Sequence, residues 1–128
     1  MDTRTRLGLL LAFSVALSAR PAAAQAPAGV TPALITQGDS IFHGKGNCYA
    51  CHGSNAQGTV GPNLTDAEWL HSDGSYDAIV KQVMTGVPKE QSKSGIVMPP
   101  RGGSTITDDE VKAVAAYVYS LSHKKAGA

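Results

Sequence analysis

The 128-residue chain lacks the features that mark several classes of protein. It has only two cysteines, too few for the disulfide framework of many small secreted domains. Eleven Lys and Arg residues against ten Asp and Glu give a formal net charge of +1, so no basic field indicates a nucleic-acid partner. No stretch sustains the period-two alternation of a strand. We therefore predict one small all-α domain.

The apolar run near the start of the chain is too short to cross a membrane. Its thirteen residues, Leu7 to Ala19, reach about 20 Å as a helix, against a hydrocarbon core of about 30 Å. Arg4 and Arg6 precede the run and small residues follow it, which is typical of a secretory signal peptide. We predict a signal peptide over 1–24 and a periplasmic mature chain without a transmembrane anchor.

The mature chain is also poor in bulky apolar residues. Val, Ile, Leu, Phe, Met, Tyr and Trp make up 26 of the 104 residues from 25 to 128. A domain of this size must offset a conformational entropy of order 100 kcal/mol, so a core this thin is marginal. The composition therefore favours a large apolar cofactor that completes the core.

Local signals predict three main helices and one short one. Thr31 and Pro32 begin a helix over 32–45 as N-cap and first helical residue. Ser75 caps a second helix over 76–85, and Thr107 forms a capping box with Glu110 at the start of the last helix. A short helix is predicted over 66–71.

The remaining segments are predicted as loops and ends. Three prolines and three glycines in residues 87–106 exclude a continuous helix there. A loop of this length inside a small domain is usually functional or disordered. The predicted organisation is a flexible lead-in over 25–31, a folded domain over 32–123 and a tail over 124–128.

The most informative pattern is Cys48-Tyr49-Ala50-Cys51-His52. Two thiols at this spacing can bond to the two vinyl groups of one porphyrin, and the next residue brings an imidazole to the iron. We therefore predict one haem c per chain, covalently attached through Cys48 and Cys51. A redox dithiol would need a βαβ context, which is absent. A disulfide between the two cysteines would close too short a loop to stabilise much.

A zinc site is the other alternative for this pattern. It needs a second pair of ligands at metal spacing. The remaining histidines, His43, His71 and His123, are scattered singly along the chain.

With this motif the chain resembles the small monohaem c-type cytochromes of the class I fold, over Ala33 to Ser122. The residues that carry the resemblance are Gly38 and Phe42 before the motif, Gly61-Pro62-Asn63-Leu64, Met98-Pro99-Pro100 and Tyr117. The resemblance implies three main helices, a short helix and long loops wrapped around one haem. It also implies that Gly38 and Phe42 pack near Tyr117 where the terminal helices cross, and that the Pro62 carbonyl accepts a hydrogen bond from His52. Trp69, Tyr76 and Arg101 are candidate partners of the haem propionates.

The sixth iron ligand decides what the haem can do. The candidates are Met98, Met84, His43, His71 and His123. Met84 lies on an apolar helix face, where methionine usually fills the core. Met98 lies in the long loop beside Pro99 and Pro100, so we predict His52 and Met98 as metal ligands. With both axial positions filled, the protein is an electron carrier and not an enzyme.

Two alternatives to this reading stay open. In the first, the sixth position is free and the haem protein acts as a peroxidase or gas-binding sensor. In the second, the chain is a haem-free binding module stabilised by a disulfide or a metal.

The charge layout suggests how partners dock. Lys45, Lys89, Lys93 and Arg101 are predicted to border the exposed haem edge, and Asp66, Glu68, Asp73 and Asp77 form an acidic segment. We expect a monomer that docks transiently with redox proteins at this edge. The donor is a dehydrogenase or reductase, and the acceptor is an oxidase or another redox protein.

Overall fold

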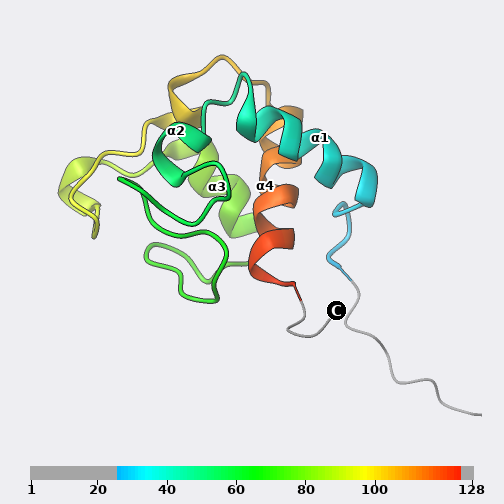
Figure 1. The fold of residues 1–128 in the computed structure, drawn as a ribbon, viewed down its shortest axis with the longest axis horizontal. Coiled ribbons are helices and arrows are strands. Elements are labelled where there is room, and N and C mark those ends of the chain that lie inside the picture. The colour runs from blue at the N-terminus through cyan, green and yellow to red at the C-terminus, as the bar shows by residue number, and fades with distance from the viewer. Residues whose placement is uncertain (1–25, 125–128) are drawn as a thin grey trace, which may run out of the picture.

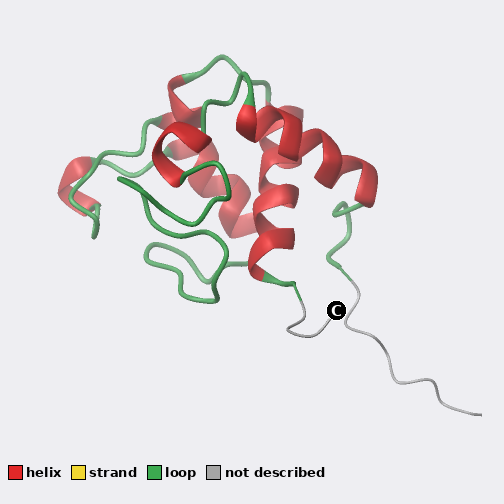
Figure 2. Cartoon of the chain, viewed as in Figure 1, coloured by secondary structure: helices red, strands yellow, loops and turns green. Residues whose placement is uncertain are grey.

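The computed structural model describes residues 26–124, and its regular elements within that range are helices joined by long loops (Figures 1 and 2). The elements are α1 (Pro32–His43), α2 (Tyr49–His52), α3 (Tyr76–Thr85), the short 3-10 helices η1 (Lys89–Gln91) and η2 (Pro100–Gly103), and α4 (Asp108–Ser122). Within this described part there is no strand, and one antiparallel bridge joins Val87 to Met98. The all-α prediction is confirmed. The predicted signal peptide lies outside the described residues, as does the predicted tail beyond Lys124.

The three main helices begin where their caps predict. Thr31 accepts a hydrogen bond from the Leu34 amide, and Ser75 accepts one from the Ala78 amide. At α4 the Thr107 side chain and the Glu110 side chain each accept from the other's backbone N–H, which completes the predicted capping box. α1 ends at His43, two residues before the predicted end.

The terminal helices cross at a point of close backbone approach. α4 lies between α1 and α3 in Figure 1. A Cβ added at Gly38 of α1 would overlap the carbonyl oxygen of Ala113 of α4. Phe42 is fully buried beside this crossing, and its ring centroid lies 5.3 Å from that of Tyr117, edge to face. The packing of Gly38 and Phe42 near Tyr117 is therefore confirmed.

The predicted helix over 66–71 is wrong, because polar side chains in this segment bind the backbone donors instead. Asn63 Oδ1 accepts from the Thr65 amide at 2.8 Å, and Asp66 Oδ1 accepts from the Glu68 amide at 3.0 Å. Such local hydrogen bonds favour turns over helix. The short helix that does form is α2, at the cysteine motif itself.

The side of α3 and α4 away from α1 is covered mainly by loops (Figure 2). Residues 53–75 form one loop, and residues 86–107 form another, interrupted only by η1 and η2. No continuous α-helix forms over 87–106, as predicted. These two loops and α2 form the walls of the candidate site together with α3, α4 and the end of α1.

Replacing Gly38 with alanine tests the helix crossing. At an open helix position this change stabilises a protein by roughly 0.5–1 kcal/mol. Here the added methyl group overlaps backbone, so we expect Gly38→Ala to lower the free energy of unfolding by about 1–3 kcal/mol in chemical denaturation. The exposed neighbour Gln37→Ala is the control. A Gly38→Ala protein as stable as this control would contradict the close crossing.

Candidate functional site

Both cysteines and the histidine of the motif line one cavity. Cys48 immediately precedes α2, and Cys51 and His52 lie on it, where the His52 amide donates to the Cys48 carbonyl at 3.0 Å. The two thiols are half-buried and are not joined in a disulfide. Burial raises the pKa of Cys48 to about 11, so this thiol is protonated at neutral pH.

His52 is held in one orientation and one protonation state. The residue is buried, with an exposed fraction of 8%. Nδ1 lies 2.8 Å from the carbonyl oxygen of Pro62, which can only accept, so Nδ1 carries the proton. Burial lowers the pKa of His52 below 6.5 and keeps the imidazole neutral. The Nε2 lone pair is therefore available to a metal.

The cavity consists of two adjoining hollows. The outer one contains about 750 Å³ of empty space, its open mouth included, and the inner one about 410 Å³. Both are lined by Cys48, His52, Gln82, Val83 and Met98. Further walls of the inner hollow are Phe42, Leu64, Trp69, Ile79, Val114 and Val118. Mostly apolar walls with a few polar groups among them are typical of a site for a small-molecule cofactor.

Met98 reaches this cavity from the long loop. Its backbone pairs with Val87 through two hydrogen bonds, with N···O distances of 2.8 and 3.0 Å. This bridge fixes the loop beside the C-terminal end of α3. The outer hollow is lined by all five residues predicted for the site: Cys48, Cys51, His52, Pro62 and Met98.

The other candidate ligands lie elsewhere or are engaged. Met84 packs against the core and lines neither hollow. The His43 ring nitrogens contact the carbonyl oxygens of Asp39 and Ser54. His123 stacks on Tyr119 with ring centroids 3.8 Å apart.

His71 does line the outer hollow, which the sequence did not predict. Its Nε2 accepts a hydrogen bond from the Lys93 amide at 3.0 Å. The Nε2 lone pair is therefore used by the protein's own backbone.

Of the three candidate partners of the haem propionates, Tyr76 and Arg101 are hydrogen-bonded to α4 or to the residues that precede it. The Tyr76 hydroxyl donates to the Lys112 carbonyl at 3.2 Å. The Arg101 guanidinium donates to the Ile106 carbonyl at 2.8 Å and to Asp108 at 2.6 Å. Trp69 is the one of the three that lines the inner hollow.

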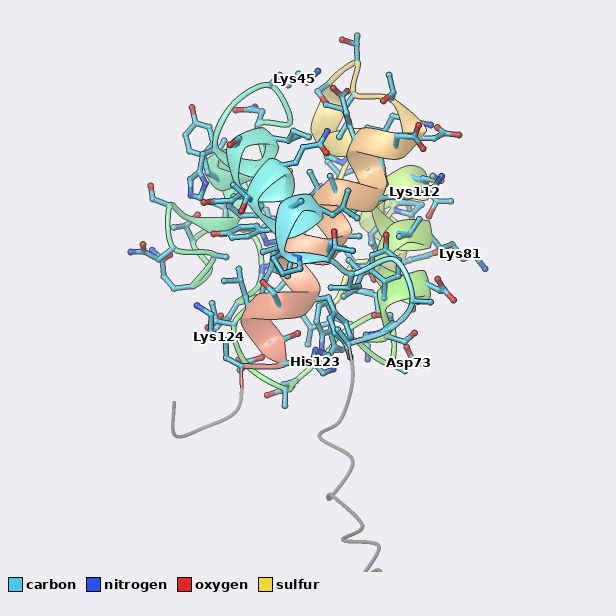
Figure 3. The ribbon with its side chains drawn as sticks, turned by 90° about the vertical axis from the view of Figure 1, so that its right-hand side faces the viewer. Lys45, Asp73, Lys81, Lys112, His123 and Lys124 are labelled. Atoms are coloured by element: carbon cyan, nitrogen blue, oxygen red, sulfur yellow. The ribbon has the colours of Figure 1, made fainter. Side chains whose placement is uncertain are left out.

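The predicted positive rim is weakened by ion pairs. Lys45 forms a salt bridge with Glu110, and Arg101 forms one with Asp108, so both cations are neutralised at the N-terminal end of α4. Figure 3 shows Lys45 at one end of the molecule, away from Lys81 and Lys124. The mouth of the outer hollow instead carries exposed apolar side chains, Ile96 at 46% and Val97 at 53% exposure.

The cavity residues fit a covalently bound haem. The two unpaired thiols suit the thioether bonds to a haem, and the neutral imidazole suits the iron. The mostly apolar walls suit the face of the porphyrin. Gln82 also fits an occupied cavity: its Oε1 is buried and, in the part of the chain described, has no hydrogen-bond partner. Sequence analysis missed Gln82, whose signal is a polar residue beside Val83 on the inner face of α3.

Fold and site together define a c-type cytochrome domain. The chain belongs to the family described as "Cytochrome C oxidase, cbb3-type, subunit III", whose model matches residues 33–118. The cofactor is haem c, supported by the family and by the arrangement of Cys48 and Cys51 before His52.

Curated relatives are longer than this chain. The cbb3-type cytochrome c oxidase subunit CcoP of Rubrivivax gelatinosus is 42% identical over 92 residues, which cover 71% of this chain and 27% of the relative. Subunit FixP of Rhizobium meliloti is 41% identical over 103 residues, which cover 76% of this chain and 30% of the relative. The chain thus spans less than a third of the length of these relatives. No helix within residues 26–124 has the length and apolar character needed to cross a membrane.

Solved structures share the fold. Cytochrome cL of Methylophaga aminisulfidivorans superposes with a TM-score of 0.58 at 24% identity, covering 73% of this chain and 57% of that one. Cytochrome cL of Hyphomicrobium denitrificans has the same TM-score at 18% identity, covering 73% and 52%. The predicted class I cytochrome c fold is confirmed.

His43 links α1 to the residues that follow the motif, and this link depends on pH. Nδ1 lies 2.9 Å from the Asp39 carbonyl and 2.8 Å from its carboxylate, and Nε2 lies 2.6 Å from the Ser54 carbonyl. The rings of Tyr49 and Tyr117 pack on the same imidazole. Only the doubly protonated ring can donate on both sides, and these acceptors raise the pKa of His43 above 6.5.

We expect His43→Gln to reduce stability in a pH-dependent way. A raised folded-state pKa adds stability that is complete below pH 6.5 and is lost as the pH rises through the folded-state pKa. The loss in unfolding free energy, measured by denaturation across this range, is therefore larger at acidic than at alkaline pH. His123→Gln is the control for removal of a histidine elsewhere. A loss independent of pH would contradict the charged link.

Proposed function

We propose that this domain carries single electrons through a haem c attached to Cys48 and Cys51, with His52 and Met98 as its two axial ligands. The observation that carries the proposal is that His52 and Met98, from α2 and from the long loop, line the same two hollows. The family and its oxidase relatives support electron transfer as the activity.

Each site residue has a separate task in this proposal. The Pro62 carbonyl holds Nδ1–H of His52, so the Nε2 lone pair would be free to bind the metal. The bridge between Val87 and Met98 fixes the backbone of Met98, whose side-chain sulfur is the proposed ligand. The haem, when bound, supplies the one-electron chemistry. A neutral thioether favours the ferrous state and raises the reduction potential.

Filled axial positions leave no site for oxygen or peroxide, which separates this proposal from a peroxidase or gas sensor. We expect the wild-type protein, matured with haem c, to show a low-spin spectrum and the weak far-red band of methionine-ligated ferric haem. Met98→Ala should lose this band, and Met84→Leu should keep it because Met84 lines neither hollow. A wild-type protein that is high-spin and readily binds carbon monoxide would support the open-site alternative instead.

The proposed setting is the periplasm, reached through the signal peptide predicted over 1–24. The donor is a dehydrogenase or reductase, and the acceptor is an oxidase or another redox protein. The names of the relatives, subunits of a cbb3-type cytochrome c oxidase, support an oxidase as the acceptor.

We propose that partners dock at the mouth of the outer hollow, where the cavity that would hold the haem opens to solvent. Ile96 and Val97 are the exposed apolar residues that line this mouth. Small apolar contacts of this kind suit the weak, short-lived complexes of redox proteins.

Replacing both apolar rim residues tests this docking site. We expect Ile96→Ser with Val97→Ser to slow the bimolecular electron-transfer rate with a redox partner by about threefold to tenfold. The reduction potential should stay the same, because neither residue is a proposed ligand. Ala33→Ser, an exposed position on α1, is the control in the same stopped-flow measurement. An unchanged rate for the double variant would place the docking surface elsewhere.

A further inference from the structure

The loop that carries Met98 makes a left-handed turn soon after that residue. Arg101, Gly102 and Gly103 have φ angles of 56°, 67° and 73°. Glycine adopts this region readily, whereas a residue with a Cβ adopts it at a cost in free energy. Arg101 is therefore held in this conformation by something other than its own backbone preference.

The guanidinium group of Arg101 supplies the holding contacts. Its Nη1 donates to the carbonyl oxygen of Ile106 at 2.8 Å, and its Nη2 donates to Oδ1 of Asp108 at 2.6 Å. Ile106 is buried, and Asp108 is the first residue of α4. The Arg101 side chain is 29% exposed, so water screens these charge-assisted bonds only in part. We call this pair of hydrogen bonds the Arg101 clamp, because it ties the left-handed turn to the start of α4.

The segment around the clamp is packed against two further parts of the site. A Cβ added at Gly86 would overlap the carbonyl oxygen of Met98, so this carbonyl touches the end of α3. A Cβ added at Gly102 would overlap the carbonyl oxygen of Gly46, in the turn before the cysteine motif. Residues 98–102 therefore lie between α3 and the motif turn, and the Arg101 clamp fixes them to α4.

A stiff connection joins Met98 to the clamp. Only Pro99 and Pro100 separate Met98 from Arg101, and the proline rings fix the φ angles of both. A rotation of the backbone at Arg101 is therefore passed on to Met98 rather than absorbed between them. Loss of the clamp would let the turn relax out of the left-handed region, and Met98 would move with it.

We propose that Arg101 is a positioning residue: its clamp holds the left-handed turn and thereby keeps the Met98 sulfur on the iron. This inference rests on the proposed function, because it requires Met98 to be an axial ligand. Arg101 itself lines neither hollow of the cavity. It acts on the site only through the backbone of the loop.

Competition by added imidazole measures how firmly Met98 is held in the ferric, haem-loaded protein. Imidazole can bind the iron only when the sulfur leaves it, so a weaker bond to Met98 lowers the dissociation constant of imidazole. We expect Arg101→Ala to lower this constant by about tenfold or more, because two hydrogen bonds from a charged donor are lost. Arg101→Lys keeps the charge without the planar fork, so its value should lie between those of wild type and Arg101→Ala.

Two neighbouring carboxylates give a matched pair of milder variants. Asp108 and Asp109 are both exposed in the first turn of α4, but Asp108 pairs with Arg101 and Asp109 pairs with Lys112. Asp108→Asn weakens the clamp and should lower the dissociation constant of imidazole by about twofold to fivefold. Asp109→Asn makes the same change of charge in the same helical turn, and it should match wild type.

Gly38→Ala controls for a general loss of stability, because it loosens the helix crossing away from the loop. It should bind imidazole as wild type does. If Gly38→Ala gains as much imidazole affinity as Arg101→Ala, the effect of Arg101 is general and the inference is wrong. The inference is also wrong if Arg101→Ala lowers the free energy of unfolding but leaves the imidazole affinity unchanged.

The far-red band of ferric methionine ligation separates failure of this inference from failure of the proposed function. A wild-type protein without the band contradicts the proposed function, and the inference fails with it. A wild-type protein that has the band, with Arg101→Ala and Asp108→Asn both at the wild-type imidazole affinity, contradicts the inference alone.

Discussion

The structure depends on an apolar cavity that the chain cannot close with its own side chains. The inner faces of α3 and α4 present Ile79, Val83, Val114 and Val118 to this space. The loops over 53–75 and 86–107 surround it and contain little regular structure of their own. A covalently held porphyrin would supply the missing core, so attachment of the cofactor and folding of the domain are coupled.

Burial in this cavity also shifts the pKa values of the site residues. Burial lowers the pKa of His52 and raises that of the free Cys48 thiol, whereas the carbonyls that His43 contacts raise its pKa. Two of the four cations predicted to border the site, Lys45 and Arg101, pair with acidic residues at the N-terminus of α4, where these residues also favour the positive end of the helix. The walls of the cavity itself are mostly apolar.

Local signals were sufficient for the three main helices and for the cofactor. A cap such as Ser75 or Thr107 acts within three residues, and the two cysteines and His52 are adjacent in sequence. The segment over 66–71 was mispredicted because Asn63 and Asp66 compete for the backbone donors, which helical periodicity does not reveal. The pairing of Lys45 with Glu110 and the position of Gln82 beside the Met98 loop join residues far apart in the chain. Only the tertiary structure brings them together.

Proton NMR of the reduced protein tests the central claim, methionine ligation by Met98, most directly. An axial methionine methyl group lies over the porphyrin, and the ring current moves its resonance upfield of all ordinary protein signals. The account predicts one such methyl resonance in the wild-type protein and its absence in Met98→Ala. A reduced, haem-loaded wild-type protein without this resonance, or with a resonance that survives Met98→Ala, would contradict the account.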